Sequence, residues 1–586
     1  MNYNLNIVSG EKEKAKTFTS LKSLLQLISH EKKNLLVAFG TILLNSSLNL
    51  LGPLLIGYTI DRYVQHGQYH GVLVFSFILL AMYLVGLFTS YFQTKLMGSI
   101  GQRMLFTLRN TIFTKLQSLP VAFFHANKAG DLISRVNNDT DKLNTFFSQS
   151  LMQFIGSIVT MTGAGIFLLI INPKLGSAAL APALFILIFT RLVSPWIKKR
   201  NALNLKNVGG MSAEIQESLI NFKVIIAFNR RDYFRKRFEE VNDRNYHSAI
   251  GAGLANNLLL PVYGLFSGLA QLIVLAYGIY LISSGSFSVG LLVSYLAYVT
   301  YFYNPLRQLA TLWSGFQIAM AGWDRIAKIL ALHSDLILVK AADNSHAQSI
   351  IAFKNVFFKY ENSQEILHNV SLQLERGKTY AFVGPTGGGK TTAASLMSRL
   401  YDATSGTILL KGKDIRSYDP SELAQIIGFI LQEPFLFSGT VKDNILYGNE
   451  TYKNISDLDA EKLIHASDLD GLLGIFEKGL QTKISSGGEN ISLGQKQLIA
   501  FMRAVLRNPE ILILDEATAN IDTVTEQMLE GILQRLPKST TRIIIAHRLN
   551  TIENADEIYF VNAGEITKAG SFEDAIHKLL KEKRAS

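Results

Sequence analysis

Six apolar runs, each long enough to cross a bilayer, lie within the first 306 residues of this 586-residue chain. A membrane-spanning helix needs about 20 consecutive apolar residues, and its backbone polar groups must be paired within the segment. The runs cover residues 35–60, 72–92, 151–171, 175–196, 258–282 and 289–306. We therefore predict an all-α transmembrane domain of six helices over residues 34–335.

The links between these runs differ in length and charge. Runs one and two, three and four, and five and six are joined by short links whose only Lys or Arg residues are Arg62 and Lys174. The other two links are long and rich in Lys and Arg, which collect in cytoplasmic loops. We therefore expect the long links, residues 1–33 and everything after run six to be cytoplasmic. The net charge of +11 is then explained without nucleic acid, and no aromatic-basic RNA motif accompanies it.

The cytoplasmic segments of this first half are predicted to be helical. Residues 21–28 place Leu and Ile at helical spacing, which favours an interfacial elbow helix, with a plain soluble helix as the alternative. The first run is too long for a cleavable signal, and no small-residue cleavage site follows it. In the first long link, apolar residues recur every three or four positions over 103–119, and a second helix is expected over 131–143. We interpret both long links as extensions of the spans, each with a short transverse helix at its tip.

A different pattern begins after residues 336–350, a polar linker. Over residues 351–586, short β-branched or aromatic runs alternate with helical stretches and glycine-rich turns, which indicates an α/β domain with a largely parallel sheet. Charged residues are only 18% of the chain, against about 25% in soluble domains, so a purely soluble enzyme is disfavoured. The absence of cysteine excludes disulfides, thiol catalysis and a Cys-ligated metal.

The strongest single motif is the segment 384–391, which matches the phosphate-binding loop pattern G-x-x-x-x-G-K-[ST]. It follows an apolar strand over 380–383 and opens a helix over 391–400, the context that this motif requires. Its glycines let backbone N–H groups surround phosphates, and the helix N-terminus adds a favourable dipole. Lys390 is expected to reach the β- and γ-phosphates, and Thr391 offers a hydroxyl to Mg²⁺.

Acidic and imidazole side chains stand at the ends of two further strands. The apolar strand 511–514 ends in Asp515, a candidate Mg²⁺ ligand partly through water, and Glu516, a candidate base that polarises the attacking water. The alternative is that both acids cap a helix. The strand 542–546 ends in His547, which we interpret as a sensor of the γ-phosphate, although a lone histidine is usually structural.

Together these motifs resemble an ATP-binding cassette (ABC) domain, in the order and spacing of that family. The matching positions are Tyr360, the loop 384–392, Gln432, the segments 491–495, 514–518 and 520–522, and His547. With six spans before it, the chain resembles an ABC exporter half-transporter over nearly its whole length. Residues 119–124 and 130–135 are similar to that family's first cytoplasmic link.

The resemblance implies a role for each matching position. Tyr360 would stack on adenine, and Gln432 would contact Mg²⁺ and the attacking water. Asp522 would couple the two ATP sites of a dimer. Ser492, Gly494 and Gln495 match the signature motif, which contacts the γ-phosphate of ATP bound to the opposite cassette. The residues expected to bind ATP are Tyr360, Gly384, Pro385, Thr386, Gly387, Gly388, Gly389, Lys390, Thr391, Thr392, Ser492, Gly494, Gln495 and Asp522. Those expected to hold Mg²⁺ are Thr391, Gln432 and Asp515, and those expected to be catalytic are Glu516, His547 and Gln432.

Two positions depart from the family pattern. The signature usually reads Leu-Ser-Gly-Gly-Gln, but its first glycine is Leu493 here, and Ser486 stands where a glutamate is common. Leu493 adds bulk where backbone approaches phosphate and should weaken γ-phosphate clamping. A complete phosphate-loop half beside an off-pattern signature half resembles one subunit of a heterodimeric bacterial multidrug exporter. A homodimer is the alternative.

The resemblance implies ATP-driven export across the bacterial cytoplasmic membrane by a dimer with two ATP molecules between its cassettes. Rival interpretations are a channel or regulator gated by ATP, a lipid flippase, a peptide exporter and an importer subunit. The spans carry almost no acids or bases, which favours hydrophobic or amphipathic cargo. Several aromatic residues could line a cavity or simply pack between helices: Tyr58, Phe92, Tyr295, Tyr298, Tyr301 and Phe302. Asn45, Asn49 and Gln271 could instead form interhelical hydrogen bonds.

Overall fold

The computed structural model describes two compact units, and each is presented by itself. One comprises Met1–Val8, Ser118–Ala129 and Leu332–Ser586, and the other comprises Ser9–Gln117 and Gly130–Ala331. The structure describes residues 3–5, 31–334, 336, 338–339, 349–361, 363–449, 451–452, 455–515, 523–545, 554–570 and 573–574. The predicted elbow helix over 21–28 lies outside these residues.

The second unit is built from helices alone in its described part. Its long helices are α2 (Lys32–Thr59), α3 (Tyr69–Gln117), α7 (Leu151–Ile171), α8 (Pro173–Ile220), α10 (Arg231–Asn257), α11 (Leu259–Ser283) and α12 (Val289–Ala331). Five helical segments of the described residues are long and apolar enough to cross a membrane, and they contain the first five predicted runs. The sixth run forms the first part of α12, which is 43 residues long. The predicted helical membrane domain is thus confirmed.

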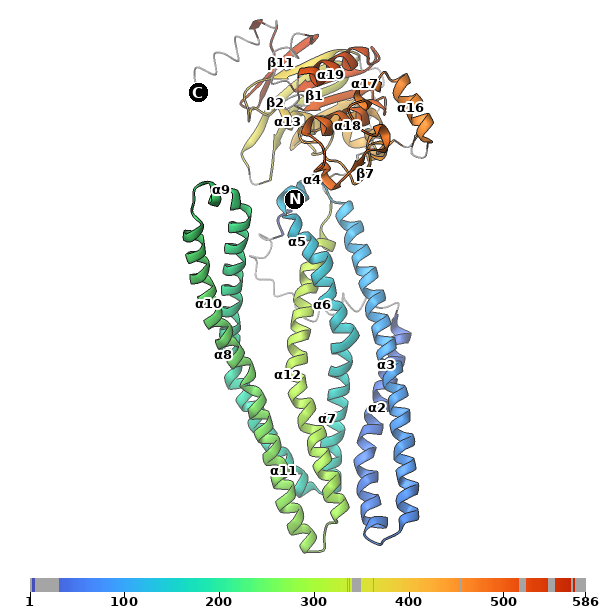
Figure 1. Cartoon of the computed structure of the whole chain (residues 1–586), viewed down its shortest axis with the longest axis vertical. Coiled ribbons are helices and arrows are strands. Elements are labelled where there is room, and N and C mark those ends of the chain that lie inside the picture. The colour runs from blue at the N-terminus through green and yellow to red at the C-terminus, as the bar shows by residue number, and fades with distance from the viewer. Residues whose placement is uncertain are drawn as a thin grey trace. The chain divides into compact units, whose positions relative to one another are not determined.

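The long links are continuous extensions of the spans, as predicted. Helix α3 alone has 49 residues, α8 has 48, and α8 and α10 run side by side (Figure 1). The first link continues through the short helices α5 (Ala129–Ser134) and α6 (Thr140–Thr145) into α7, with π-helical turns at Arg135–Asp139 and Phe146–Ser150. Each link also contains an expected short helix, α4 (Val121–Ala126) in the first and α9 (Phe222–Ala227) in the second, and α4 belongs to the other unit.

The sequence of the short link between α7 and α8 explains why the chain reverses there. Asn172 has extended backbone angles, and its side chain accepts a hydrogen bond from the Leu175 N–H at 3.1 Å. Pro173 follows at the first helical position, where its missing N–H has no intrahelical partner in any case. Asn172 is therefore both the end of one span and the N-cap of the next.

Helices α2 and α12 approach each other closely at two glycines. A Cβ atom added to Gly57 would overlap Ser294 and the Gly290 carbonyl, and one added to Gly290 would overlap the Gly57 carbonyl and Asp61. Asp61 also accepts hydrogen bonds from the Gly290 N–H at 2.7 Å and from the Ser288 hydroxyl. The two backbones touch because neither carries a side chain at this point, a recurrent feature of membrane helices.

A buried charge network joins the first link to the far part of α12. Arg135, 4% exposed, pairs with Asp131 at 2.9 Å and donates to the Arg325 carbonyl at 2.8 Å. The Arg325 guanidinium pairs with Asp131 at 2.6 Å and with the fully buried Asp139 at 3.3 Å. Buried charges need such mutual pairing, so α5, the π-helical turn Arg135–Asp139 and α12 are held in one arrangement.

The other unit contains an α/β fold with three sheets in its described residues. The six-stranded sheet has the order β12-β11-β3-β10-β9-β6, and its strands are parallel except for β12. A four-stranded antiparallel sheet has the order β2-β1-β4-β5, and β7 pairs with β8. The strands are β1 (Ser349–Lys359), β2 (Glu365–Glu375), β3 (Thr379–Val383), β4 (Ser405–Leu410), β5 (Lys413–Asp414), β6 (Ile427–Ile430), β7 (Gly439–Thr440), β8 (Lys483–Ile484), β9 (Ile511–Asp515), β10 (Thr541–Ile545), β11 (Glu557–Asn562) and β12 (Glu565–Lys568).

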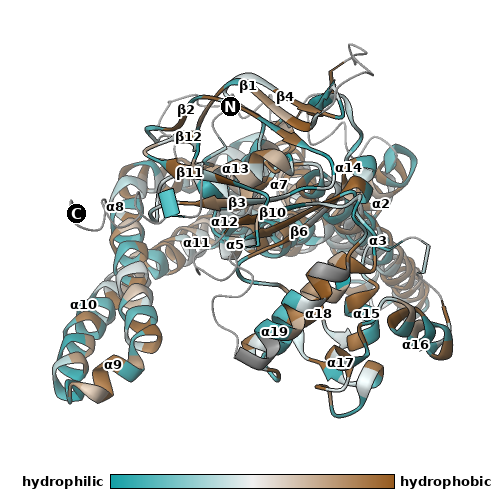
Figure 2. Ribbon diagram, turned by 90° about the horizontal axis from the view of Figure 1, so that it is seen from above, coloured by the Kyte–Doolittle hydropathy of each residue, from teal (hydrophilic) through white to brown (hydrophobic). Residues whose placement is uncertain are grey.

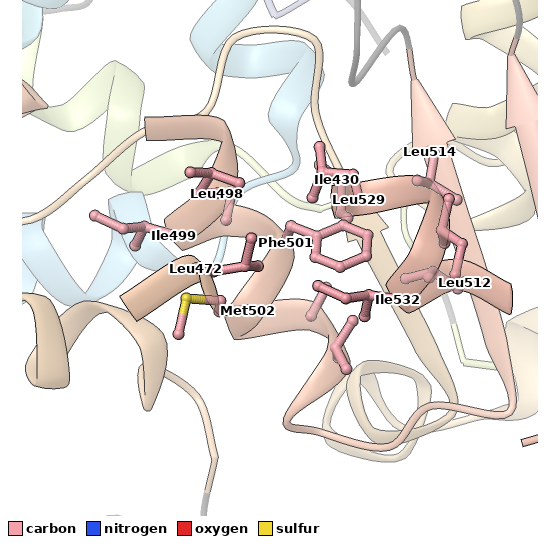
Figure 3. Packing of buried hydrophobic residues seen from close by; sticks show 14 of the residues in the cluster. Ile430, Leu472, Leu498, Ile499, Phe501, Met502, Leu512, Leu514, Leu529 and Ile532 are labelled. Atoms are coloured by element: carbon pink, nitrogen blue, oxygen red, sulfur yellow. The ribbon is translucent and has the colours of Figure 1, made fainter. Parts of the chain in front are cut away.

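Helices cover this sheet and add a helical lobe. They are α13 (Lys390–Met397), α14 (Pro420–Ile426), α15 (Val441–Ile445), α16 (Asp457–Ala466), α17 (Asp470–Leu473), α18 (Leu493–Val505) and α19 (Thr523–Arg535). Helix α18 is amphipathic, with hydrophobic and hydrophilic faces (Figure 2). The ring of Phe501 on its buried face lies near Ile430, Leu529 and Ile532 (Figure 3). The parallel strands are buried on both faces, as continuous apolar runs require.

Two segments from the N-terminal half complete this unit. Tyr3 and Leu5 are buried, and the side chain of Asn127, just after α4, holds the backbone between them. Its Nδ2 donates to the Tyr3 carbonyl at 2.8 Å, and its Oδ1 accepts from the Leu5 N–H at 3.1 Å. The Tyr3 N–H also donates to Glu361, and its ring meets Phe123 edge-on. We call this arrangement the Asn127 clasp.

Candidate functional site

The loop after β3 has a backbone that only glycine tolerates at three places. Gly384, Gly387 and Gly389 have φ values of 152°, 83° and 111°. A Cβ atom at Gly384 would overlap the Val561 carbonyl of β11, so the loop lies directly against the neighbouring strand. This geometry turns the chain sharply from the buried strand β3 into α13, and it is the backbone that the phosphate-loop motif predicts.

Lys390 is held inside this loop. Its ammonium group donates to the carbonyl oxygens of Gly384 and Pro385, each at 2.9 Å, and the residue is 5% exposed. A buried ammonium at a helix N-terminus concentrates positive charge beside the loop's backbone N–H groups. Such a site is complementary to phosphate oxygens.

The structure brings together two residues that are 124 positions apart in the sequence. The Thr391 hydroxyl lies 3.2 Å from Asp515 Oδ1, and Asp515 is 2% exposed at the end of β9. Strands β3 and β9 both pair in parallel with β10, so their carboxyl ends meet at one edge of the sheet. A hydroxyl and a carboxylate are the oxygen donors that Mg²⁺ prefers, and this pair therefore fits a magnesium ion bound beside phosphates.

Tyr360 lies at the side of the same helix. Its hydroxyl is 3.2 Å from the Thr392 hydroxyl, and its ring packs edge-on against Phe358 and Tyr401, with centroids 4.8 and 5.1 Å apart. Burial raises the pKa of Tyr401, and the neighbouring Tyr360 adds to the shift. A fixed aromatic ring next to a phosphate loop is what stacking on a nucleotide base requires.

The predicted signature residues form a separate element of the helical lobe. Ser492 is the N-cap of α18, and its hydroxyl accepts from the Gln495 N–H at 3.1 Å while the Gln495 side chain accepts from the Ser492 N–H at 2.9 Å. The other hydrogen bond of Gln495 goes to the Ile475 carbonyl. Gly494 is half-buried, and Leu493 is 40% exposed at the first helical position. In the described residues, the hydrogen bonds of Ser492 and Gln495 thus stay within this lobe and do not reach the phosphate loop.

Comparison with known proteins decides the family. The model of the ABC transporter transmembrane region matches residues 35–306, and the ABC transporter model matches residues 367–519. An ABC transporter ATP-binding protein of Bacillus subtilis, YfiC, is 33% identical over 97% of this chain and 94% of its own.

The chain belongs to the ABC exporter family.

Other relatives in this family carry different names. The ATP-dependent lipid A-core flippase of Syntrophus aciditrophicus is 32% identical over 84% of this chain and 82% of its own. A multidrug resistance ABC transporter ATP-binding and permease protein of Lactococcus lactis is 29% identical over 96% of this chain and 95% of its own. The ABC exporter described here therefore binds and hydrolyses ATP in a domain fused to membrane-spanning helices, and the names of its relatives leave its cargo open.

Several predicted residues of this ABC exporter have no described position. Glu516, Asp522 and His547 lie outside the described residues. Strand β9 ends at Asp515 and β10 at Ile545, so the chain enters both segments from the same edge of the sheet as the phosphate loop. Gln432 is exposed two residues after β6, which is the neighbour of β9. Ser486 is exposed in a short turn.

Sequence analysis did not identify Arg503. This residue of α18 hydrogen-bonds to Phe435, three residues after Gln432, and so connects α18 to that part of the chain. Its Nε donates to the Asn444 carbonyl at 2.8 Å, one NH2 group donates to Asn444 Oδ1 at 3.1 Å, and the other donates to the Phe435 carbonyl at 3.2 Å. The guanidinium also lies over the Tyr447 ring at 5.4 Å, and burial lowers the pKa of Arg503. No sequence motif marks this residue, because its role depends on contacts with residues far from it in the sequence, Phe435, Asn444 and Tyr447.

The aromatic candidates in the membrane domain differ in their burial. Tyr295 and Tyr298 are fully buried and donate to the Asn172 carbonyl at 2.9 Å and the Leu50 carbonyl at 2.7 Å, so they pack helices. Tyr58 and Phe92 are exposed, and Tyr301 and Phe302 are half-buried.

The polar candidates in the membrane domain differ in whether their hydrogen-bond partner lies on another helix. Gln271 of α11 donates to Thr300 of α12 at 3.2 Å, which confirms its predicted interhelical bond. For Asn45 and Asn49 that interpretation is wrong, because Asn49 donates to Asn45 within α2 itself.

Proposed function

We propose that this chain is one half of a dimeric exporter that moves hydrophobic or amphipathic compounds across the bacterial cytoplasmic membrane, driven by ATP hydrolysis. The observation that carries the proposal is the Thr391–Asp515 pair beside the buried Lys390, in a chain whose other half spans the membrane. Clusters of Lys and Arg in the long links support a cytoplasmic location for the ATPase domain and the link tips.

The proposed division of labour follows the chemistry of each side chain. Tyr360 stacks on adenine, the backbone of residues 384–389 and Lys390 bind the phosphates, and Thr391, Asp515 and Gln432 hold Mg²⁺. The ion would neutralise charge on the β- and γ-phosphate oxygens. Glu516 polarises the attacking water, and His547 contacts the γ-phosphate. Asp522 couples the two sites.

The signature residues require a second chain. Because Ser492 and Gln495 hydrogen-bond within their own lobe, α18 is free to present its N-terminus to ATP held by a partner. Two ATP molecules would then be enclosed between two cassettes. ATP binds this closed state more tightly, which pulls the link helices together and opens the membrane domain outward. Hydrolysis resets the transporter.

We propose a heterodimer, in which a partner supplies a signature with glycine at the position of Leu493. A homodimer is the second candidate. Co-purification of a tagged copy from its native host tests this directly. A different half-transporter recovered in equal amount supports the heterodimer, whereas recovery of this chain alone contradicts it.

ATP-dependent uptake into inside-out membrane vesicles tests the whole proposal. Glu516→Gln should bind ATP and lose at least about 10²-fold in hydrolysis, the usual scale for loss of a general base. Lys390→Ala should weaken nucleotide binding itself, measured with a fluorescent ATP analogue. Normal turnover in Glu516→Gln would contradict the role assigned to Glu516. ATP binding without any coupled transport would contradict an exporter and favour an ATP-gated regulator.

A lipid flippase is a further candidate function, because one of the relatives is named an ATP-dependent lipid A-core flippase. Reconstitution into liposomes with labelled lipids distinguishes lipid translocation from release of a soluble compound.

A further inference from the structure

A cavity of about 530 Å³ lies within the membrane domain. It is lined by one face each of α2, α3, α7 and α12, together with the π-helical turn before α7. Its volume is within the range of sites that hold small organic ligands, about 300–1,000 Å³. All of its lining residues belong to the helical unit.

The described part of the lining is polar and contains no charged side chain. Twelve of the sixteen lining residues are Ser, Thr, Asn or Gln, and the other four are Ile, Met, Gly and Pro. On α2 the polar members include Asn45 and Asn49, one turn apart, and on α7 they include Gln153, Ser157 and Thr160. Polar side chains at helical spacing on converging helices make a continuous polar wall inside an apolar domain.

Helix packing does not account for these groups. Gln93 Oε1 is buried without a hydrogen-bond partner among the described residues. The two bonds that cross between helices here, Ser157 to Gln308 and Thr160 to Ser46, are long at 3.4 Å. A buried polar group that stays unpaired is costly, so amides and hydroxyls gathered around an open volume indicate a ligand that pairs with them.

The absence of other groups from the lining restricts the ligand. Among the residues that the structure describes, the lining has no carboxylate and no aromatic ring with which to hold a cation, and no Lys or Arg with which to hold an anion. Side-chain amides both donate and accept, and they match hydroxyls or amides of a neutral molecule. Apolar surface inside the membrane favours a ligand with an apolar body.

We propose that this cavity is the cargo site, and that its cargo is an uncharged amphipath whose hydroxyl- or amide-bearing head enters the cavity. The proposal rests on the exporter function above and narrows it, because cationic lipophilic compounds are excluded as preferred cargo. A membrane glycolipid and a soluble glycosylated compound share this chemistry.

A matched pair of probes tests the charge preference. ATPase stimulation of the complete transporter in nanodiscs is measured with octyl glucoside and with octyltrimethylammonium, which share a chain length and differ in head group. We expect stimulation by the glucoside at a concentration at least tenfold lower than by the cation. Equal or stronger stimulation by the cation overturns the proposal. Stimulation by glucose alone would identify a soluble source, and a requirement for the octyl chain would identify a membrane source.

Substitution of one lining amide tests the place of binding. Gln153→Leu keeps the side-chain size and removes both hydrogen-bonding groups, so the half-stimulating concentration of octyl glucoside should rise about tenfold, which corresponds to 1.4 kcal/mol. The control is Gln271→Leu, a membrane amide that lies outside the lining and should leave the response unchanged. An equal effect of both variants overturns the assignment. So does dissociation of the Gln153→Leu transporter on size-exclusion chromatography, because the amides would then belong to the dimer interface.

The failure of this inference is distinguishable from the failure of the exporter function. If inside-out vesicles accumulate a cationic dye in an ATP-dependent manner and ignore neutral glycosides, the exporter stands and the cargo assignment is wrong. If ATP drives no transport of any probe, while a photoreactive alkyl glucoside still labels residues 148–160, the cavity stands and the exporter is wrong.

Discussion

The proposed Mg²⁺ site depends on two single residues, Thr391 and Asp515, which come from distant parts of the chain. Both were predicted as Mg²⁺ ligands from motif and strand position, and the structure places their oxygens 3.2 Å apart. Arg503 shows the limit, because a lone arginine in an apolar helix has no signal until its partners Asn444 and Phe435 are known. Sequence therefore predicted the residues fixed by local motifs and missed those fixed by tertiary contacts.

Leu493 gives the first prediction at this scale. It occupies the first position of α18, where a smaller residue would let the helix N-terminus approach a phosphate. Leu493→Gly should raise ATP hydrolysis by the assembled transporter roughly fivefold, the effect of about 1 kcal/mol of improved charge-assisted hydrogen bonding. Steady-state phosphate release measures it. Leu458→Gly, at an exposed leucine in the first turn of α16, is the control and should change nothing. A loss of activity in Leu493→Gly would contradict the clamping role.

Glu557 gives a prediction about pH. Burial alone would raise the pKa of Glu557, but hydrogen bonds from Lys378 and Lys568, each at 3.0 Å, outweigh it and hold the pKa below its usual range. A depressed carboxylate pKa adds stability above the unfolded-state pKa of about 4.3, and this stability is lost as the pH falls through the folded-state pKa.

Glu557→Gln should therefore reduce the stability of the ATPase domain by about 1 kcal/mol at pH 7. The difference from the unmodified protein should shrink below about pH 4.3, as thermal unfolding between pH 3.5 and pH 7 would record. Glu565→Gln, at an exposed position on β12, is the matched control. A difference that persists unchanged in acid would argue against the ion pairs as its cause.

At the scale of elements, the spans were predictable because their apolar length alone decides that they are helical. Their mutual packing was not, since it depends on which faces meet. Gly57 and Gly290 are ordinary glycines in the sequence, and only the structure shows that their backbones touch. The same reason hid the polar cavity: Asn45 and Asn49 were interpreted as interhelical bonds, and their position on a shared wall with α7 became visible only in three dimensions.

The close contact between Gly57 and Gly290 predicts that adding one methyl group at this point lowers the stability of the protein. Gly290→Ala would overlap the Gly57 carbonyl and Asp61, and backbone cannot move aside as a flexible side chain can. Overpacking of this kind costs roughly 1–3 kcal/mol, so the detergent-solubilised protein should unfold at a temperature several degrees lower. Gly86→Ala on α3, whose Cβ would meet nothing within 4 Å, should be neutral. Equal melting temperatures for the two variants would refute the tight contact.

At the scale of the whole molecule, the division into units does not follow the order of the chain. Residues from near the N-terminus and from the first link pack with the ATPase domain through the Asn127 clasp. The predicted boundaries at 335 and 350 separate the sequence motifs, but periodicity along the chain cannot reveal that distant segments join the second fold. No sequence pattern around Asn127 predicts its contact with Tyr3 and Leu5.

The Asn127 clasp predicts a local loss of protection. Asn127→Leu removes three hydrogen bonds of the Asn127 side chain, to the Tyr3 carbonyl, the Leu5 N–H and the Phe123 carbonyl. The two bonds to the N-terminal segment are each worth about 1 kcal/mol, so amide hydrogens at Tyr3–Leu5 should exchange at least about tenfold faster. Hydrogen exchange followed by mass spectrometry of the N-terminal peptide measures this in the full chain. Asn138→Leu, at an exposed asparagine of the first link, serves as the control. Unchanged exchange in Asn127→Leu would show that the clasp contributes nothing.

The same arrangement limits how this transporter can be recombined with its relatives. A chimera that exchanges only residues 351–586 would keep the original Tyr3, Leu5 and α4, which pack with the original ATPase domain. Their contacts with the new ATPase domain would then not match. Chimeras should fold and transport when the N-terminal segment and α4 are exchanged together with the ATPase domain. Substitutions in any of these three parts should be accompanied in evolution by compensating substitutions in the other two.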